Sequence, residues 1–253
     1  MHWKLKNQTK RAFAKAASLT ALAIFFLPQI TFAWSIDSFK SDIKIEPNSK
    51  ILVTETIQAD YSVDPHHGLT RFIPIHYKDS IGNNLSLDFN LISITDEHGR
   101  SWNYEKSSSG DNVQFKIGDA DVLLHKPATF VISYEIYGAI TYFKDHDELY
   151  WNITGDKWDT YIKTASATIT LPPNTPNDKI KVTCFTGYSG STQQNCTTSV
   201  QKNSPSVTIS SQAPNLPHLG PVSRHDRLKH CSSLPDLIGR HLLVEFCGRI
   251  CDR

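Results

Sequence analysis

The sequence predicts an all-β protein: an antiparallel two-sheet β-sandwich, immunoglobulin-like or jelly-roll-like, after an N-terminal signal helix. Three observations predict it. Residues 50–63 alternate apolar and polar side chains with a period of two, as a half-buried strand does. Further short stretches rich in Ile, Val, Thr, Tyr and Phe follow, with turn-forming residues between them. No stretch between 34 and 213 carries a helical stripe of apolar side chains.

Residues 1–33 have the features of an export signal. A basic start without acidic residues precedes an apolar run at 16–27, and the small residues Thr31 and Ala33 suit cleavage before Trp34. A membrane span needs roughly 20 apolar residues, so an uncleaved anchor is the less favoured alternative. We expect an exported protein, periplasmic or at the cell surface, that stays membrane-associated if the signal is retained.

Residues 34–213 are expected to form the sandwich domain. In the strand at 50–63, the apolar side chains from Ile51 to Val63 occupy alternate positions and share one face. Turn sequences such as "EPNS", "IGNN" and "LPPNTPND" divide the remainder into strands. The other expected strands are 36–46, 70–77, 85–95, 113–117, 129–140, 148–153, 162–171, 179–185 and 205–211.

The charge and motif content of this domain excludes several classes of function. Residues 34–213 hold 15 lysines and arginines against 21 acidic residues, a net charge of −6. This balance argues against a nucleic-acid partner, because such binding depends on neutralising phosphates. The sequence contains no phosphate-binding glycine loop, zinc-protease histidine pair or nucleophile elbow. We therefore expect no catalytic residues and no cofactor.

Cys184 and Cys196 are the only cysteines before residue 214, in "CFTGYSGSTQQNC". Outside the cytoplasm such a pair normally forms a disulfide, and closing so short a loop stabilises by about 3 kcal/mol. A metal site is the weaker interpretation, because no histidine lies between or near them. We expect the disulfide.

Residues 214–253 differ from the rest of the chain. They hold three of the five cysteines and five of the eight arginines, and they lack the strand rhythm. One interpretation is a disordered tail with a short amphipathic helix near 234–247. The favoured interpretation is that the genuine reading frame ends near Ala213 and that the rest is out-of-frame translation.

Four stretches in this order carry a resemblance to a known family: "ILVTETI", "HHGLTRFIP", "DELYWNITGDKWDTYIKTASATITLP" and "CFTGYSGSTQQNC". The chain resembles, over 34–213, the N-terminal extracytoplasmic part of predicted membrane proteins that carry domain of unknown function 2207. The resemblance implies an extracytoplasmic location and membrane association through transmembrane helices that usually follow. This chain departs from the family there, since nothing after 213 is apolar enough to span a bilayer. The family has no settled activity.

Glu55 and Arg71 are the candidate site residues. Glu55 lies on the apolar face of its strand, between Val53 and Ile57, and a buried carboxylate needs a partner. Arg71 is the only arginine between residues 12 and 99. We predict a structural ion pair between them, with ligand binding as the alternative. A tight hairpin would hold them apart, so the pair requires a wider loop or a crossing between sheets.

Two other polar clusters contain residue types that can bind metal ions, but a turn explains each of them. His66 and His67 lie in "DPHHG", where Pro65 and Gly68 favour a turn over a metal site. Asp145, Asp147 and Glu148 offer oxygen ligands of the kind calcium prefers, but their spacing is not that of a standard calcium loop. An acidic turn explains them equally well, so they are weak calcium candidates.

The sequence thus favours a non-enzymatic exported module of a membrane-protein family, truncated before its helices, with a role in envelope interaction or sensing. Its partner is an unknown envelope protein or a glycan. The alternative is a carbohydrate-binding or glycan-hydrolysing exported domain. That alternative requires an open groove lined by exposed aromatic side chains, for which Trp102, Trp151 and Trp158 are the candidates.

Overall fold

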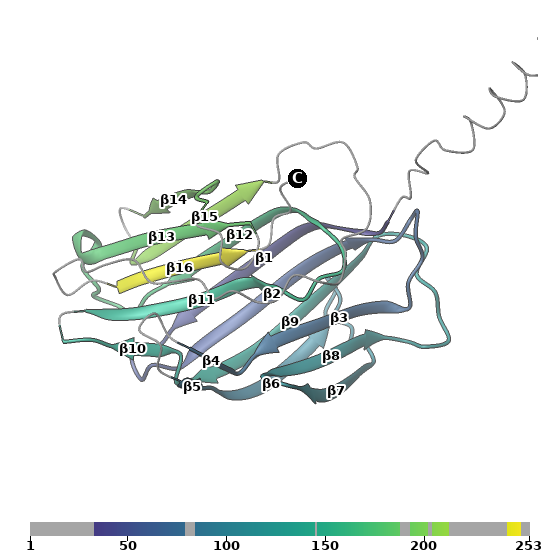
Figure 1. The fold of residues 1–253 in the computed structure, drawn as a ribbon, viewed down its shortest axis with the longest axis horizontal. Coiled ribbons are helices and arrows are strands. Elements are labelled where there is room, and N and C mark those ends of the chain that lie inside the picture. Colours follow the sequence, from purple (N-terminus) through teal and green to yellow (C-terminus); the bar gives the residue numbers. More distant parts are fainter. Residues whose placement is uncertain are drawn as a thin grey trace, which may run out of the picture. The chain divides into compact units, whose positions relative to one another are not determined.

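The computed structural model describes residues 33–78, 84–144, 146–187, 193–201, 204–212 and 242–248, all within one compact unit. In these ranges the chain forms sixteen strands and one short 3-10 helix, η1 (Asn177–Lys179) (Figure 1). Among the described residues no helix has the length and apolarity needed to cross a bilayer. The expected signal helix lies outside the described residues.

The largest sheet has seven strands, and its β1–β12 pair is parallel whereas its other pairs are antiparallel. In spatial order its strands are β14 (Thr197–Val200), β15 (Ser206–Gln212), β12 (Ile162–Thr170), β1 (Ser35–Ile45), β2 (Ile51–Asp60), β9 (Ala128–Tyr137) and β6 (Asp88–Thr95).

One face of this sheet contributes to the core, as the alternation in the sequence predicted. Along β2 the odd-numbered residues from Ile51 to Ala59 are buried, and most residues between them are partly exposed. Each large apolar side chain buried in this way stabilises the fold by about 1.5–3 kcal/mol. The expectation that Val63 shares this face is wrong, because β2 ends at Asp60 and Val63 is 61% exposed.

The described residues also form three smaller sheets. The first contains β3 (Gly68–Pro74), β8 (Asn112–Gly118) and β7 (Tyr104–Ser109) in that order, and a two-stranded sheet pairs β4 (His76–Lys78) with β5 (Asn84–Ser86). The four-stranded sheet contains, in order, β10 (Ile140–Tyr142), β11 (Asp147–Gly155), β16 (Leu242–Gly248) and β13 (Ile180–Thr186).

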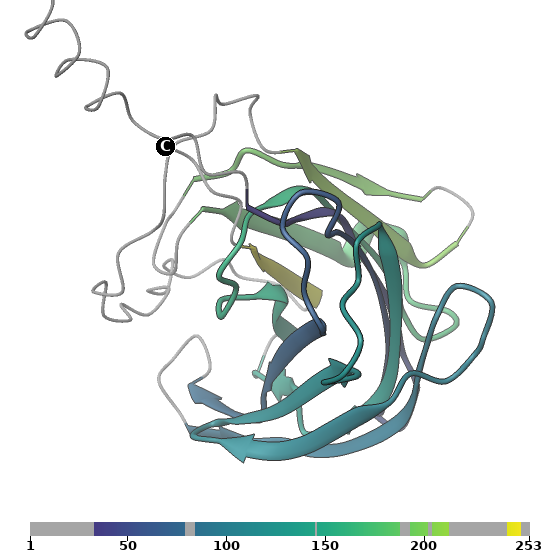
Figure 2. The ribbon, with the colours of Figure 1, turned by 90° about the vertical axis from the view of Figure 1, so that its right-hand side faces the viewer.

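The core lies between the seven-stranded sheet and the smaller sheets. Figure 2 shows the large sheet curved, with β3 and β11 on its inner side. Phe89 of β6 packs against Phe115 of β8, with ring centroids 5.9 Å apart. Trp102 stacks on Phe130 of β9 at 4.9 Å. The contact between Phe89 and Phe115 joins strands of two different sheets.

The all-β class is confirmed, but the arrangement of two purely antiparallel sheets is wrong. The described residues form four sheets, and the pairs β1–β12, β11–β16 and β13–β16 are parallel. A period of two reports which side chains of a strand are buried, but it carries no information on the direction of the neighbouring strand.

Part of the C-terminal tail belongs to the fold. Residues 242–248 form β16, which pairs in parallel with β11 on one side and β13 on the other. These seven residues form a strand, which differs from the interpretation of a disordered tail with a short amphipathic helix near 234–247. The apolar sequence "LLVEFCG" suits a strand that has a neighbour on both edges. Residues 213–241 and 249–253 lie outside the described residues.

Candidate functional site

Glu55 and Arg71 meet in the core and form a two-pronged ion pair. Arg71 Nε donates to Glu55 Oε2 at 2.8 Å, and Arg71 Nη2 donates to Glu55 Oε1 at 2.6 Å. Glu55 is 0% exposed and Arg71 is 2% exposed. Parallel hydrogen bonds of this kind are the strongest geometry available to a carboxylate and a guanidinium.

The pair forms because β2 and β3 belong to different sheets. Glu55 lies in the seven-stranded sheet, opposite Ile132 of β9, whereas Arg71 lies in the three-stranded sheet, opposite Phe115 of β8. The connection 61–67 therefore carries the chain from one sheet to the other, so that the two side chains point toward each other across the core. A hairpin between neighbouring strands would have separated them.

The remaining polar atoms of the pair also have partners. Tyr134 Oη donates to Glu55 Oε1 at 2.7 Å. Arg71 Nη1 donates to the carbonyl oxygens of Phe72 at 2.8 Å and Thr154 at 3.0 Å. Burying charged groups costs free energy unless they are hydrogen-bonded, so these bonds offset the cost of burying the pair.

Aromatic rings enclose the guanidinium. Arg71 Cζ lies 5.4 Å from the ring centre of Phe39 and 5.6 Å from that of Trp158. Trp158 is held in turn by its Nε1, which donates to the Thr154 carbonyl oxygen at 2.7 Å. The rings both exclude water and attract the cation, so the charge of Arg71 is stabilised without exposure to solvent.

The electrostatics of the cluster favour the charged pair. Burial alone would lower the pKa of Arg71, but the negative charge and hydrogen bonds of Glu55 outweigh it, and the pKa of Arg71 lies above its usual value. Burial raises the pKa of Tyr134 well above its usual value, and the charge of Glu55 adds to the shift. Tyr134 therefore stays protonated and remains a donor.

Two small residues complete the surroundings of the pair. Gly155, at the end of β11, has a φ of +78°, and a Cβ there would lie 2.3 Å from Arg71 Nη1. Ser41 of β1 lies opposite Glu55 and is fully buried, and its Oγ has no hydrogen-bond partner among the described residues. Because a Cβ at position 155 would collide with Arg71 Nη1, a glycine is required there for the guanidinium to reach its position.

Three of the four family-like stretches converge on this cluster. "ILVTETI" supplies Glu55, "HHGLTRFIP" supplies Arg71, and "LYWNITG…W" supplies Thr154, Gly155 and Trp158. Glu55, Arg71 and Tyr134 are each at most 2% exposed. A substrate cannot reach these groups unless the fold opens, so the arrangement suits the joining of sheets and not proton transfer to a ligand.

The contributions of Tyr134, Thr154 and Gly155 were not predicted. Tyr134 is a β9 residue whose position opposite Val53 places its hydroxyl diagonally across from Glu55. The sequence offers one signal for it, a phenol on a strand face that is otherwise apolar. For Thr154 the contact is made by the backbone carbonyl, which has no residue-specific signal.

His66 and His67 direct their rings to different partners. His66 Nε2 lies 3.2 Å from Asp64 Oδ2, and its ring packs against Trp34 and Tyr61. His67 Nδ1 lies 3.1 Å from the Val122 carbonyl oxygen. The two imidazoles therefore do not converge on a common point.

The weak calcium candidates do not gather either. Asp147 is exposed and Glu148 is buried, because adjacent strand residues point to opposite sides of β11. Asp145 lies outside the described residues. Within the described part of the chain, no three His, Cys, Asp or Glu side chains lie close enough together to hold a metal ion.

The three tryptophans considered for a sugar platform face the interior. Trp151 is 5% exposed and Trp158 is 6% exposed. Trp102 is half-buried, and its Nε1 donates to the Thr129 carbonyl oxygen at 3.1 Å. Sugar-binding aromatic platforms present open ring faces, so these three side chains do not form one.

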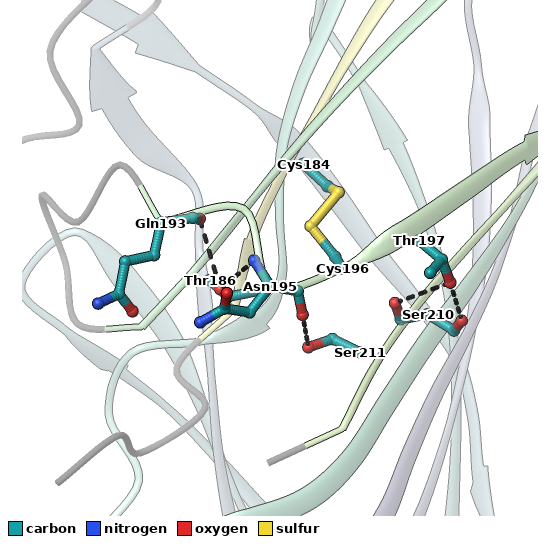
Figure 3. The surroundings of a disulfide bond; sticks show 8 residues. All are labelled: Cys184, Thr186, Gln193, Asn195, Cys196, Thr197, Ser210 and Ser211. Atoms are coloured by element: carbon teal, nitrogen blue, oxygen red, sulfur yellow. Dashed lines mark hydrogen bonds between the residues drawn. A yellow bond between two sulfur atoms is a disulfide. The ribbon is translucent and has the colours of Figure 1, made fainter. Parts of the chain in front are cut away.

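Cys184 and Cys196 form a disulfide that joins two sheets (Figure 3). Cys184 belongs to β13 of the four-stranded sheet, and Cys196 directly precedes β14 of the seven-stranded sheet. Next to it, Asn195 N donates to Thr186 Oγ1 at 3.1 Å, and Ser211 Oγ donates to the Asn195 carbonyl oxygen at 2.8 Å. The bond between Asn195 and Thr186 thus joins the same two segments as the bridge.

Replacing both cysteines, by Cys184→Ser with Cys196→Ser, is expected to lower the free energy of unfolding by about 3 kcal/mol, because the unfolded chain loses a closed loop. Urea unfolding followed by circular dichroism measures the change. Serine variants of the two tail cysteines outside the described residues, Cys231 and Cys251, serve as the control and should unfold as the wild type does. An unchanged unfolding midpoint in the double variant would contradict a stabilising bridge.

Comparison with solved structures yields only distant similarity. The M1 zinc metallopeptidase from Deinococcus radiodurans is 6% identical with a TM-score of 0.38, and the match covers 72% of this chain and 39% of that one. Native yeast LTA4 hydrolase is 8% identical with a TM-score of 0.39, and the match covers 70% of this chain and 28% of that one. This chain therefore spans well under half the length of either, and similarity this weak carries no information on activity.

Comparison by sequence is more informative. Among curated proteins none matches the chain. A family model described as "Predicted membrane protein (DUF2207) N-terminal domain" matches residues 35–217, which include the buried ion pair and the disulfide. The chain belongs to this family of predicted membrane proteins, through its N-terminal domain.

Proposed function

We propose that residues 34–213 form an extracytoplasmic module of a membrane-associated protein, and that the module acts in interaction or sensing at the cell envelope. The observation that carries the proposal is the family match over 35–217, because the family is described as the N-terminal domain of predicted membrane proteins. The apolar run at 16–27 supports export. The Cys184–Cys196 bridge supports an oxidising compartment.

In this proposal the Glu55–Arg71 cluster has a structural role. It joins the seven-stranded sheet to the three-stranded sheet and to the end of β11, and its charged groups have no route to solvent. A module that binds a partner benefits from such rigidity, because fewer conformations are lost on binding. The partner that fits this role is another protein of the envelope.

A localisation experiment tests the proposal. The full chain, carrying a C-terminal epitope tag, is expressed in a Gram-negative bacterium, and the thiols of Cys184 and Cys196 are assessed by alkylation before and after reduction. We expect the chain outside the cytoplasm, with these two thiols blocked until reductant is added. Mass spectrometry of the N-terminus then shows whether the chain begins at Trp34 or keeps residues 1–33.

The matched control interrupts the apolar run with Leu22→Arg and Ile24→Arg, which should retain the chain in the cytoplasm with both thiols free, because the run no longer partitions into the membrane. A wild-type chain that stays cytoplasmic with free Cys184 and Cys196 would disprove the proposal.

A further inference from the structure

β1 begins and β15 ends at the same end of the seven-stranded sheet. β1 begins at Ser35, and its next residue, Ile36, pairs with Ile162 at the start of β12. Near that point Thr164 of β12 pairs with Gln212, the last residue of β15. The first residue of β1 and the last residue of β15 therefore lie at the same end of this sheet.

Two connections between strands are at this end as well, namely 61–67 between β2 and β3 and 119–127 between β8 and β9. Ser35 pairs with Asp60, the last residue of β2, and Ala59 pairs with Ala128, the first residue of β9. Figure 1 shows both connections at the end where β1 begins, and Figure 2 views the domain from that side. We call these two connections together the loop end.

The two connections of the loop end are joined by hydrogen bonds. Leu124 N donates to the His66 carbonyl oxygen at 2.8 Å, and Asp119 N donates to the His67 carbonyl oxygen at 3.2 Å. His67 Nδ1 also contacts the Val122 carbonyl oxygen at 3.1 Å. The loop end is thus one structured surface, held at a defined position relative to the sheet.

Exposed apolar side chains are concentrated on this surface. Val63 is 61% exposed, Val122 is 51% exposed and Leu123 is 45% exposed. Exposure of aliphatic side chains to water is unfavourable in free energy. Their occurrence in two joined loops therefore indicates a surface that is covered when the protein functions.

Trp34, the residue directly before β1, packs against the loop end. Its ring packs against Tyr61 at 5.4 Å and His66 at 5.3 Å, and its carbonyl oxygen accepts a hydrogen bond from Thr160 Oγ1. Only six residues separate Trp34 from the apolar run at 16–27. Such a short connection keeps the loop end close to any bilayer that holds that run.

The charges of the loop end limit how deeply it can enter a bilayer. Asp119 and Asp121 are exposed next to Val122 and Leu123, and Lys126 is exposed a few residues further on. Carboxylates are costly in the hydrocarbon core, so contact is restricted to the interfacial layer. The mixed signs also remove any strong preference for anionic lipids.

We propose that the loop end faces the bilayer and that Val63, Val122 and Leu123 rest in its interfacial layer. This orientation rests on the proposed membrane association, with residues 1–33 retained as an anchor, and extends it by naming the surface that contacts lipid. The opposite end, where Tyr137 ends β9 and Tyr142 of β10 contacts Ser49 in the β1–β2 turn, then points away from the membrane toward a partner.

Photolabelling from within the bilayer tests the orientation. The full chain is reconstituted in phosphatidylcholine vesicles that contain a lipid-soluble diazirine, and labelled positions are mapped by mass spectrometry. We expect label on the peptides that carry Val63 and Val122–Leu123, and on residues 16–27. The double variant Val122→Asp with Leu123→Asp should lose most of the label at Val63, because two added charges lift the loops out of the apolar layer.

Ile92→Asp serves as the matched control, because Ile92 is also exposed, at 56%, but lies on β6 away from the loop end. It should leave the labelling of Val63 unchanged. Label on 16–27 with none at the loop end, or with label at Tyr137 and Tyr142 instead, overturns the orientation while the membrane association stands. Absence of label everywhere overturns both.

Discussion

Replacing Arg71 with methionine is expected to lower the free energy of unfolding by about 3–5 kcal/mol, because Glu55 would remain buried with no cation beside it. Glu55 then keeps one hydrogen bond, from Tyr134, in place of three. Replacing Glu55 with leucine leaves the buried guanidinium without its anion, and it should lower the free energy of unfolding by a similar amount. Urea unfolding followed by tryptophan fluorescence and circular dichroism measures each change.

The double variant Glu55→Leu with Arg71→Met distinguishes a structural pair from independent contributions. It should be more stable than the sum of the single changes predicts, because neither charge is left unpaired. Ser41→Ala is the matched control: it lies opposite Glu55 and is fully buried. Its Oγ accepts and donates no hydrogen bond among the described residues, so its loss should change stability by less than about 1 kcal/mol. An Arg71→Met variant as stable as the wild type would contradict this account.

Replacing Gly155 with alanine is expected to lower the free energy of unfolding by about 2–4 kcal/mol, through backbone strain of about 1–2 kcal/mol and displacement of a buried charge. The added Cβ would lie 2.3 Å from Arg71 Nη1, so the guanidinium must move away from the carbonyl oxygens of Phe72 and Thr154. Chemical unfolding of the purified variant measures the loss.

Gly99→Ala provides the control for the backbone component. Gly99 has a φ of +79°, almost the same as that of Gly155, but a Cβ there would meet nothing within 4 Å. The difference between the two alanine variants therefore isolates the collision with Arg71. In the Arg71→Met background that difference should shrink, since methionine can move aside. Equal costs for the two glycine substitutions would show that the guanidinium is not held tightly.

Much of the candidate site was predictable because it violates the strand pattern. Glu55 interrupts an apolar face, and physical chemistry demands a partner for a buried carboxylate. Arg71 was then the nearest arginine available in the sequence. What could not be predicted is the enclosure of the pair by Phe39, Tyr134 and Trp158, because these residues come from three other segments. Only the packing of sheets brings them together.

The fold was predictable to a similar extent. Alternation in the sequence located most of the strands, since a side chain that faces the core must be apolar. β7 (Tyr104–Ser109) was missed, because nearly all its side chains are exposed and polar, so it leaves no apolar signal. The end of β2 was placed too late, because Tyr61 is buried beyond the last paired residue, Asp60.

By itself, the sequence determined the all-β class, the strands of the core, the isolated cysteine pair and the need of Glu55 for a partner. Each of these follows from local composition or from the cost of burying a charge. Only the tertiary structure decided that the described residues form four sheets with three parallel strand pairs, and that β2 and β3 face each other across the core. The physical reason is that strand pairing joins backbone groups, which every residue except proline carries alike, so residue types specify burial far better than they specify neighbours.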